Sequence, residues 1–385
     1  MSRRRNMILV ATVIAFTAGP ASAAQTDAPK PAKESRVKAE TVAKGLASPW
    51  GLQFLPDGRM LVTEKPGRLR IVTRDGKVGA AISGVPKVFA TGQGGLLDVL
   101  LATDFGPRGG DIYLSFSEPR EDGAAATAVA RARLTLDDTG GGTLSGLETI
   151  FQQQPAVAKS GNHFGSRLVW APDRSLFVTT GDRGSARSEV QKPDTTIGKV
   201  LNLKPDGSPA HSQPAQPGWD PKIWSLGHRN IQGAALDPAT GELWTVEHGA
   251  RGGDELNLTK RGKNYGWPII TYSNEYFGGA IGEGTSRPGI EQPVYYWVPS
   301  IATSGLAIYS GDLFPEWKGN IFVGGLKGAQ LSRLVLKNGE VVAEETLLRD
   351  LDQRIRDVRQ GPDGALWLLT DDPRDGQIVR LSPAS

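Results

Sequence analysis

Residues 50–72 read WGLQFLPDGRMLVTEKPGRLRIV and hold the pattern that decides the fold. A short apolar run leads into the turn sequence Pro56-Asp57-Gly58, and the alternating segment MLVTE follows it. Alternation with a period of two residues, bounded by Pro, Asp and Gly, is typical of antiparallel strands joined by tight turns. This stretch therefore predicts paired strands of one small sheet.

The same arrangement recurs along the chain. Clear copies begin at Gly165, Ile231 and Ile355, and weaker ones at Gly95 and Ser304, which makes six units. Each unit then has about 58 residues, enough for a four-stranded blade and a functional loop. The 49 glycines and 26 prolines suit turns, and no amphipathic helix of the kind a TIM barrel needs is visible. The sequence predicts an all-β protein, a six-bladed β-propeller with four-stranded antiparallel blades.

The N-terminal region predicts export. Residues 1–23 combine three arginines, an apolar stretch and the small-residue site Ala21-Ser22-Ala23, which indicates a signal peptide too short to span a membrane and a periplasmic or secreted protein. Residues 24–37 are polar and rich in Pro and Lys, which predicts a disordered leader. Residues 38–385 then form one propeller domain. The last unit has too few strands, so we expect residues 37–44 to supply its fourth strand.

Charge and cysteine content narrow the function. The chain has 44 Lys and Arg against 41 Asp and Glu, and removing the three leader arginines leaves 41 of each. This balance gives no reason to expect a nucleic-acid partner. The chain has no cysteine, so the exported protein depends on core packing or metal rather than on disulfides.

His163 and Asp182 bracket one predicted hairpin, within SGNHFGSRLVWAPDRSLFVTTGDRG at 160–184. The two ends of a hairpin lie side by side, so an aspartate there can hold one imidazole nitrogen and leave the other as a general base. The alternative is an Asx turn at Gly181-Asp182 with an unrelated histidine.

Polar residues at equivalent points of the repeats should converge on one face of the propeller. Arg354 and Arg356 are two residues apart, which places both on one face of a strand. Clustered cations repel one another unless an anion joins them, so a ligand with several carboxylates or phosphates would suit them. The alternative is solvated arginines at the edge. The other polar residues at such points are Gln93, Arg229, Asn230, Gln232 and Lys327.

The segment EHGARGGDELNLTKRGKNYGWP, from Glu247 to Pro268, is rich in oxygen ligands. Oxygen donors on a glycine-rich loop suit Ca²⁺ better than Zn²⁺, and the order differs from an EF-hand. The candidate ligands are Glu247, the carbonyls of Gly249 and Ala250, Asp254, Glu255 and Tyr265. Most tryptophans of a propeller are core residues, but Trp297 or its neighbours in YYWVPS are candidates for a sugar-binding cleft.

Taken in order, these motifs resemble the soluble, PQQ-dependent aldose sugar dehydrogenases, a quinoprotein family of exported six-bladed propellers. The resemblance runs from about residue 40 to the C-terminus. The motifs that carry it are SPWGLQFLPDGRMLVTEKPGRLRIV, QGGLLDV, GNHFGSRL with GDRG, LGHRNIQG, EHGARGGDELN with KNYGWP, and QRIRDVRQGPDGALWLLTDD.

The resemblance implies a role for each candidate. His163 matches the base that takes the proton of the anomeric hydroxyl while hydride passes from C1 to PQQ, Asp182 matches the residue that orients it, and Arg229 matches the cation beside the quinone. The residues that match cofactor contacts are Gln93, Arg229, Asn230, Gln232, Lys327, Arg354 and Arg356. The residues that match ligands of Ca²⁺ are Gly249 and Ala250, beside the cofactor, and Glu255 and Tyr265, at a further site that stabilises the fold.

Two other functions remain open at this point. A Ca²⁺-dependent propeller lactonase would use His163 to activate water and would need no cationic cradle. A non-catalytic propeller that only binds carbohydrate would not need His163, Asp182 and Arg229 together. For the dehydrogenase we expect a small aldose substrate, an external electron acceptor, and a monomer or homodimer.

Overall fold

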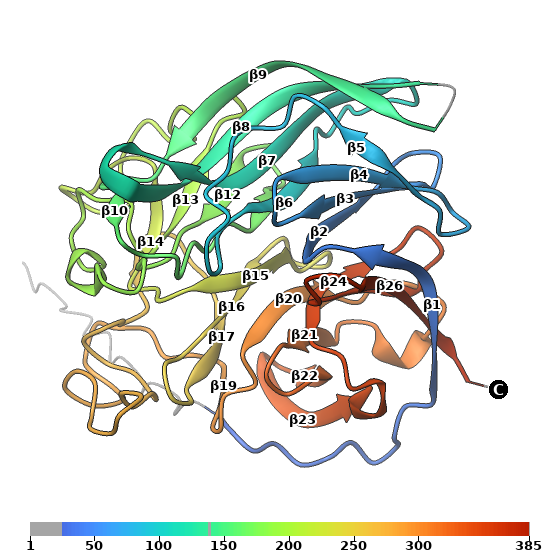
Figure 1. Ribbon diagram of the computed structural model, residues 1–385. Helices are drawn as coiled ribbons and strands as arrows, with labels where there is room; N and C mark the ends of the chain where they lie inside the picture. The colour runs from blue at the N-terminus through green and yellow to red at the C-terminus, as the bar shows by residue number, and fades with distance from the viewer. Residues whose placement is uncertain (1–24, 138–139, 385) are drawn as a thin grey trace, which may run out of the picture.

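The computed structural model describes residues 25–137 and 140–384. Six sheets stand around a common centre, as predicted, and form a six-bladed β-propeller (Figure 1). The first strand of each repeat contacts the first strands of both neighbouring repeats, which closes an inner ring of six strands. The predicted signal peptide, residues 1–23, lies outside the described residues. Within the described part of the chain, no helix is long and apolar enough to cross a membrane.

The blades follow one another in chain order. Blade 1 contains β2 (Pro49–Phe54), β3 (Met60–Glu64), β4 (Arg68–Val72) and β5 (Val78–Ile82). Blade 2 contains β6 (Leu96–Leu101), β7 (Gly109–Pro119), β8 (Ala124–Leu136), β9 (Gly142–Gln152) and β10 (Val157–Ala158). Blade 3 contains β11 (Leu168–Trp170), β12 (Leu176–Thr179), β13 (Lys199–Leu203), β14 (Ile223–Leu226) and β18 (Lys263–Asn264). Blade 4 contains β15 (Ile231–Leu236), β16 (Leu243–Glu247), β17 (Asp254–Leu258) and β19 (Tyr295–Trp297). Blade 5 contains β20 (Thr303–Ile308), β21 (Ile321–Gly325), β22 (Gln330–Lys337) and β23 (Glu340–Leu347). Blade 6 contains β24 (Ile355–Gln360), β25 (Leu366–Thr370), β26 (Gly376–Pro383) and β1 (Val37–Leu46).

Two blades carry more than the four predicted strands. In blade 2, β8 is 13 residues long, and this length lets β10 pair with its first residues while β9 pairs with the rest. In blade 3, the two-residue strand β18 adds to the edge of β14 in parallel orientation. β18 covers the edge strand β14, and β10 covers the first residues of β8, which β9 does not reach; both additions pair backbone groups that would otherwise be left open.

The N-terminus closes the ring, as predicted. β1 pairs with β26 in antiparallel register, from Val37 opposite Pro383 to Leu46 opposite Gly376, so the first strand of the domain completes the last blade (Figure 1). Because β1 and β26 belong to one sheet, the propeller cannot open at this blade without breaking their pairing.

The expected disordered leader differs from the structure. Residues 25–36 lie along blades 4 and 5: the Gln25 carbonyl accepts from Tyr296 N at 2.9 Å, and the Pro29 carbonyl accepts from Glu344 N at 2.9 Å. Ser35 donates to the Glu345 carboxylate through its backbone N (2.5 Å) and Oγ (2.7 Å). The prediction considered only the composition of this segment, whereas exposed donors on the edges of β19 and β23 hold it in place.

Apolar side chains fill the seams between blades, and a buried ion cluster joins three inner strands. This central ion cluster consists of Asp98, Arg167, Asp357 and Arg359. Arg167 Nη1 lies 3.1 Å from Asp98 and 3.2 Å from Asp357, and Arg359 reaches the same two carboxylates at 2.9 and 2.8 Å. Two cations against two anions leave the cluster itself without net charge. The cluster fixes blades 2, 3 and 6 relative to one another.

Candidate active site

His163 and Asp182 meet at one end of the blade 3 hairpin, as their spacing predicts. His163 Nδ1 lies 2.6 Å from Asp182 Oδ1, and the imidazole side chain is 12% exposed. Burial lowers the pKa of His163, and the charges of Arg229 and Arg183 also lower it, whereas the hydrogen bond to Asp182 raises it by a smaller amount. The ring is therefore neutral near pH 7. Its Nδ1–H donates to Asp182, which leaves Nε2 with a free lone pair.

Asp182 stays ionised although it is buried. Its Oδ1 also accepts from Gly184 N at 2.7 Å, and its Oδ2 accepts from Trp267 Nε1 at 2.8 Å. Burial alone would raise the pKa of Asp182, but the hydrogen bond and charge of His163, together with Arg229 and the Gly184 N–H, outweigh burial and lower it. Donors surround both oxygens, so the carboxylate is held in one orientation.

Arg183 positions the His163 loop, a role that the sequence reasoning missed. Its guanidinium is buried over the Phe164 ring, donates to the Ser160 carbonyl at 2.8 Å and also donates to the Asn162 carbonyl. Burial lowers the pKa of Arg183 to about 9, so the side chain remains charged at neutral pH. The backbone of His163 has a φ of 51°, a left-handed conformation that costs free energy and needs such support. The only signal in the sequence was the arginine of GDRG.

Arg229 lies beside this pair and is 5% exposed. Its backbone N donates to Glu247, its Nη1 donates to the carbonyls of His248 (3.1 Å) and Gly249 (2.5 Å), and its guanidinium lies 5.3 Å from the centre of the Trp267 ring. Nε of Arg229 is buried and has no hydrogen-bond partner among the described residues. A fixed cation with spare hydrogen-bonding capacity thus lies next to the candidate base.

Amide side chains connect the base to the arginines. Gln93 Oε1 accepts from His163 N at 2.9 Å and from Asn230 Nδ2 at 3.4 Å. Gln232 donates to Asn230 Oδ1 at 3.2 Å and accepts from Arg356 Nη1 at 2.8 Å. The structure therefore brings Gln93, Asn230, Gln232 and Arg356 into one hydrogen-bonded chain that crosses the face of the propeller.

The cationic group has a partner that the sequence reasoning missed. Asp371 Oδ2 accepts from Arg354 at 3.0 Å and from Arg356 at 3.1 Å. Burial alone would raise its pKa, but the charges of Arg356 and Arg354 dominate and lower the pKa of Asp371 to about 2. Lys65 belongs to the same group, since burial and the charge of the nearby Arg356 lower the pKa of Lys65. Both residues follow the second strand of a repeat, the position that Asp182 holds in blade 3.

The negative charge of Asp371 does not balance the positive charges around it. Asp371 supplies one negative charge near Lys65, Arg354 and Arg356, and Arg356 Nε is buried with no hydrogen-bond partner in the described part of the chain. Lys327 is exposed and directly follows Leu326, whose carbonyl accepts from Arg354. An excess of fixed positive charge remains on this face, which favours an anionic ligand.

A cavity of about 420 Å³ opens above the base. Its lining includes His163, Asp182, Arg229, Ala250 and Gln93, and Trp267, Arg187 and Tyr276 are among the lining side chains that the sequence reasoning did not single out. Arg187 and Glu275 form an ion pair of 2.7 Å that joins two loops of the lining. The volume lies in the range of small-molecule sites.

Trp297 is not part of this cavity. It is 5% exposed, packs edge-on against Tyr295 and donates to Glu344 Oε1 at 2.8 Å. Its indole N–H finds a partner in the wall of blades 4 and 5, so the residue is a core tryptophan. Trp297 and its neighbours line a separate hollow of about 700 Å³, so a sugar cleft there stays a prediction, and Trp267 is the tryptophan that faces the candidate site.

Gly249 and Ala250 form a tight turn at the cavity. A Cβ on Gly249 would lie 2.0 Å from the Gly252 carbonyl oxygen, so only glycine fits there. The Gly249 carbonyl accepts from Arg229, and a carbonyl oxygen has a second lone pair for a cation.

Glu255 and Tyr265 lie outside the cavity, around Glu247. The Glu255 carboxylate is opposite Glu247 on paired strands, and burial together with the charge of Glu247 raises the pKa of Glu255 well above its usual value. Asn257 Oδ1 is buried nearby without a hydrogen-bond partner among the described residues. The Tyr265 hydroxyl is engaged, since it donates to the Leu258 carbonyl and accepts from Lys260 N. Two facing carboxyl groups and an unpaired amide oxygen are hard oxygen donors of the kind that suit Ca²⁺, and Tyr265 as a further ligand stays a prediction.

A family model described as Glucose / Sorbosone dehydrogenase matches residues 46–380. The chain belongs to this family. It is 42% identical to the aldose sugar dehydrogenase YliI of Escherichia coli (strain K12), over 91% of this chain and 94% of that protein. The protein is thus an oxidoreductase of the sugar dehydrogenase family, and an aldose as substrate is consistent with this membership.

Solved structures of family members have the same fold. A crystal structure titled glucose dehydrogenase is 45% identical, with a TM-score of 0.85 over 90% of this chain and all of that one. The aldose sugar dehydrogenase of Streptomyces coelicolor, whose structure is of the PQQ-bound form, is 30% identical, with a TM-score of 0.74 over 92% of this chain and all of that one.

Proposed function

We propose that this member of the family oxidises aldose sugars at C1 to lactones, with PQQ as its bound oxidant and Ca²⁺ at the carbonyls of Gly249 and Ala250. The observation that carries the proposal is the neutral His163 held by ionised Asp182 in a cavity beside an excess of fixed cations. The unpaired Nε atoms of Arg229 and Arg356 fit the three carboxylates and the quinone oxygens of PQQ.

The residues divide the reaction between them. PQQ, when bound, would accept the hydride, which carries the electron pair from C1, and Ca²⁺ would act as a Lewis acid. His163 Nε2 takes the proton of the anomeric hydroxyl as the C1–O bond becomes a carbonyl. Asp182 holds the ring by Nδ1–H and stabilises the imidazolium that forms. Arg229 supplies positive charge in the same cavity without reorganising, because the Gly249 and His248 carbonyls already hold it.

Gln93 fixes the base from the other side. Its amide oxygen accepts the His163 backbone N–H, and the same oxygen accepts from Asn230, so blades 2, 3 and 4 meet at this point. Trp267 covers Asp182 and limits the access of water to the carboxylate, because its indole N–H occupies Oδ2. The aldose ring then has the space between His163, Arg187 and Tyr276.

The test is dye-linked oxidation of glucose and other aldoses by metal-stripped protein, with and without added PQQ and Ca²⁺. We expect activity only with both additions. His163→Ala should abolish turnover and retain PQQ binding, whereas Lys192→Ala, at an exposed residue outside the cavity lining, should keep most of the activity.

Two results would count against the proposal. Hydrolysis of sugar lactones without PQQ would assign the site to a lactonase, and sugar binding without any turnover would assign it to a binding propeller. Full activity of His163→Ala would remove the histidine mechanism while leaving the family membership intact.

We also infer a periplasmic or secreted location and an external electron acceptor. The sequence of residues 1–23 supports export, since the arginines, the apolar stretch and Ala21-Ser22-Ala23 follow the order of a cleavable signal. N-terminal sequencing of the protein from the periplasmic fraction tests this location. A mature chain that still begins at Met1 would contradict it.

A further inference from the structure

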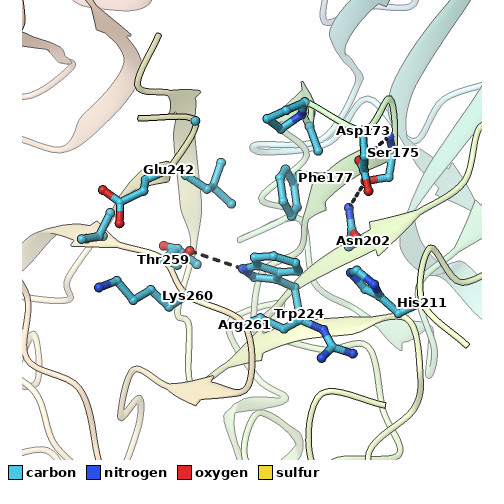
Figure 2. A pocket seen from close by; sticks show the side chains of 15 residues that line it. Asp173, Ser175, Phe177, Asn202, His211, Trp224, Glu242, Thr259, Lys260 and Arg261 are labelled. Carbon is cyan, nitrogen blue, oxygen red and sulfur yellow. Dashed lines mark hydrogen bonds between the residues drawn. The ribbon is translucent and has the colours of Figure 1, made fainter. Parts of the chain in front are cut away.

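A second cavity, of about 370 Å³, lies between blades 3 and 4 at the opposite end of the blades from His163. Its wall includes the turn at 171–175, which joins β11 to β12, whereas His163 and Asp182 are at the other end of these strands. Figure 2 shows the side chains that surround it. The volume falls in the range of small-molecule sites. The catalytic proposal makes no use of this cavity.

Asn202 presents an unpaired oxygen here. The residue is 2% exposed, and its Nδ2 donates to Ser175 Oγ at 2.8 Å. Ser175 Oγ in turn donates to Asp173 at 2.6 Å, so it can only accept from Asn202, and this sets the orientation of the amide (Figure 2). Asn202 Oδ1 is therefore the free end, and it has no hydrogen-bond partner among the described residues. A buried acceptor without a donor costs free energy, which a ligand hydroxyl would recover.

His211 supplies a second unpaired atom. Its Nε2 is buried and also lacks a partner within the described residues. Burial and the charge of Arg261 lower the pKa of His211, so the imidazole is neutral and can either donate or accept. Two unsatisfied polar atoms from different elements thus line one cavity.

Aromatic rings form the remainder of the inner wall. Trp224 packs against Phe177 with ring centres 4.9 Å apart and against His211 at 5.9 Å. Its indole N–H donates to the Thr259 carbonyl at 3.3 Å, so the polar edge of the ring is engaged and the apolar face is left for a ligand (Figure 2). The C–H bonds of a sugar ring carry slight positive charge and suit the negative face of an indole.

The outer lining is balanced in charge. Asp173 and Glu242 contribute two negative charges, and Lys260 and Arg261 contribute two positive charges. Arg261 also donates to the Gln213 carbonyl at 2.7 Å, which holds it at the edge. Such a site has no net attraction for an anion or a cation, unlike the cationic face at the catalytic end.

We propose that this cavity is a second carbohydrate site, which binds a neutral mono- or disaccharide by stacking on Trp224 and by hydroxyl hydrogen bonds to Asn202 Oδ1 and His211 Nε2. The site is separate from the catalytic cavity and does not depend on the proposed redox chemistry. It gives the protein a way to hold a sugar without oxidising it.

The test uses full-length, PQQ-free protein and the indole N–H signals of its nine tryptophans in a ¹H–¹⁵N spectrum, titrated with D-glucose and with maltose. Trp224→Phe assigns the Trp224 signal, and Trp267 reports separately on the catalytic cavity. We expect a saturable shift of the Trp224 signal. His211→Ala should weaken that binding by about 3- to 10-fold, the effect of one hydrogen bond, and leave the Trp267 titration unchanged.

Trp170→Phe is the matched control. Trp170 makes the same edge-on contact with Tyr113 in the neighbouring seam and donates to the Leu101 carbonyl, but it does not line this cavity. Its replacement should leave the Trp224 titration as it was. The proposal is overturned if neither sugar shifts the Trp224 signal, or if His211→Ala has no effect on the shift. It is also overturned if indole, an apolar probe, binds there and the sugars do not.

Discussion

Replacing Asp182 with asparagine tests the organisation of the active site most directly. Every neighbour of the carboxylate is a donor: His163 Nδ1 and Gly184 N at Oδ1, and Trp267 Nε1 at Oδ2. An asparagine NH₂ group must therefore face a donor in one orientation or the other. If it faces Trp267, His163 keeps a hydrogen bond but loses the charge that strengthens it. If it faces His163, the ring must change tautomer, and Nε2 then carries the proton and cannot act as a base.

The size of the effect follows from these two outcomes. Loss of the charge alone exchanges a charged hydrogen bond for a neutral one, which costs about 1 to 1.5 kcal/mol, or about tenfold in rate. Loss of the tautomer removes general-base catalysis, which contributes about 10²- to 10⁴-fold. We therefore expect kcat/KM for aldose oxidation to fall at least about tenfold. Because Asp182 raises the pKa of His163, the acid limb of the pH profile should also move to lower pH.

The assay is dye-linked aldose oxidation at saturating PQQ and Ca²⁺, with PQQ binding measured separately by fluorescence. Asp194→Asn is the matched control, because Asp194 is an exposed aspartate on the same loop, outside the cavity lining. Unchanged kcat/KM and an unchanged acid limb in Asp182→Asn, with normal PQQ binding, would refute the assignment of His163 as the base.

Three further predictions concern pH, stability and substrate size. In the intact enzyme, kcat/KM should fall as pH drops through a pKa below the 6.5 of a free imidazole, because burial lowers the pKa of His163 and keeps Nε2 unprotonated to lower pH. An acid limb above pH 6.5 in the pH–rate profile would contradict this. Asp98→Ala should lower the free energy of unfolding, measured by urea titration, by about 3 to 5 kcal/mol, because it leaves Arg167 and Arg359 buried with one anion between them. Asp111→Ala, at an exposed pair with Arg133, should lower it by only about 0 to 1 kcal/mol. Equal effects of the two substitutions would show that the central ion cluster makes no special contribution to stability. Phe277→Ala should raise KM for a disaccharide several-fold and leave KM for glucose unchanged, because Phe277 is fully exposed beside Tyr276 of the cavity and such an apolar surface favours a second sugar ring. Steady-state kinetics with both substrates tests this, and KM values that move together would contradict it.

Local patterns account for what the sequence predicted well. The period-two alternation and turns that carry Pro and Asp recur along the chain, and the structure confirms β2, β3 and their equivalents in the other blades. The pairing of His163 with Asp182 was also predictable, because the two residues are 19 apart and a single hairpin brings them together. Closure by residues 37–44 followed from the missing strand of the last unit and is confirmed by β1.

Contacts between distant segments were not predictable in the same way. Lys65 of blade 1 approaches Arg356 of blade 6, which lies nearly 300 residues later in the chain. Residues 25–36 look disordered by composition, yet they pair with backbone groups more than 260 residues later. The partner in each case belongs to another part of the chain, so the local composition holds no sign of it.

The sequence by itself determined the number of blades, their closure and the identity of the candidate base, because each depends on periodicity or on neighbours within one hairpin. Only the tertiary structure decided which charges are balanced, which tryptophan faces the active site and where a second cavity opens. These properties depend on how six blades pack around a common axis, which places side chains together without regard to their separation in sequence. Trp267 and Trp297 are only thirty residues apart, but packing puts the first over Asp182 and the second in the wall between blades 4 and 5.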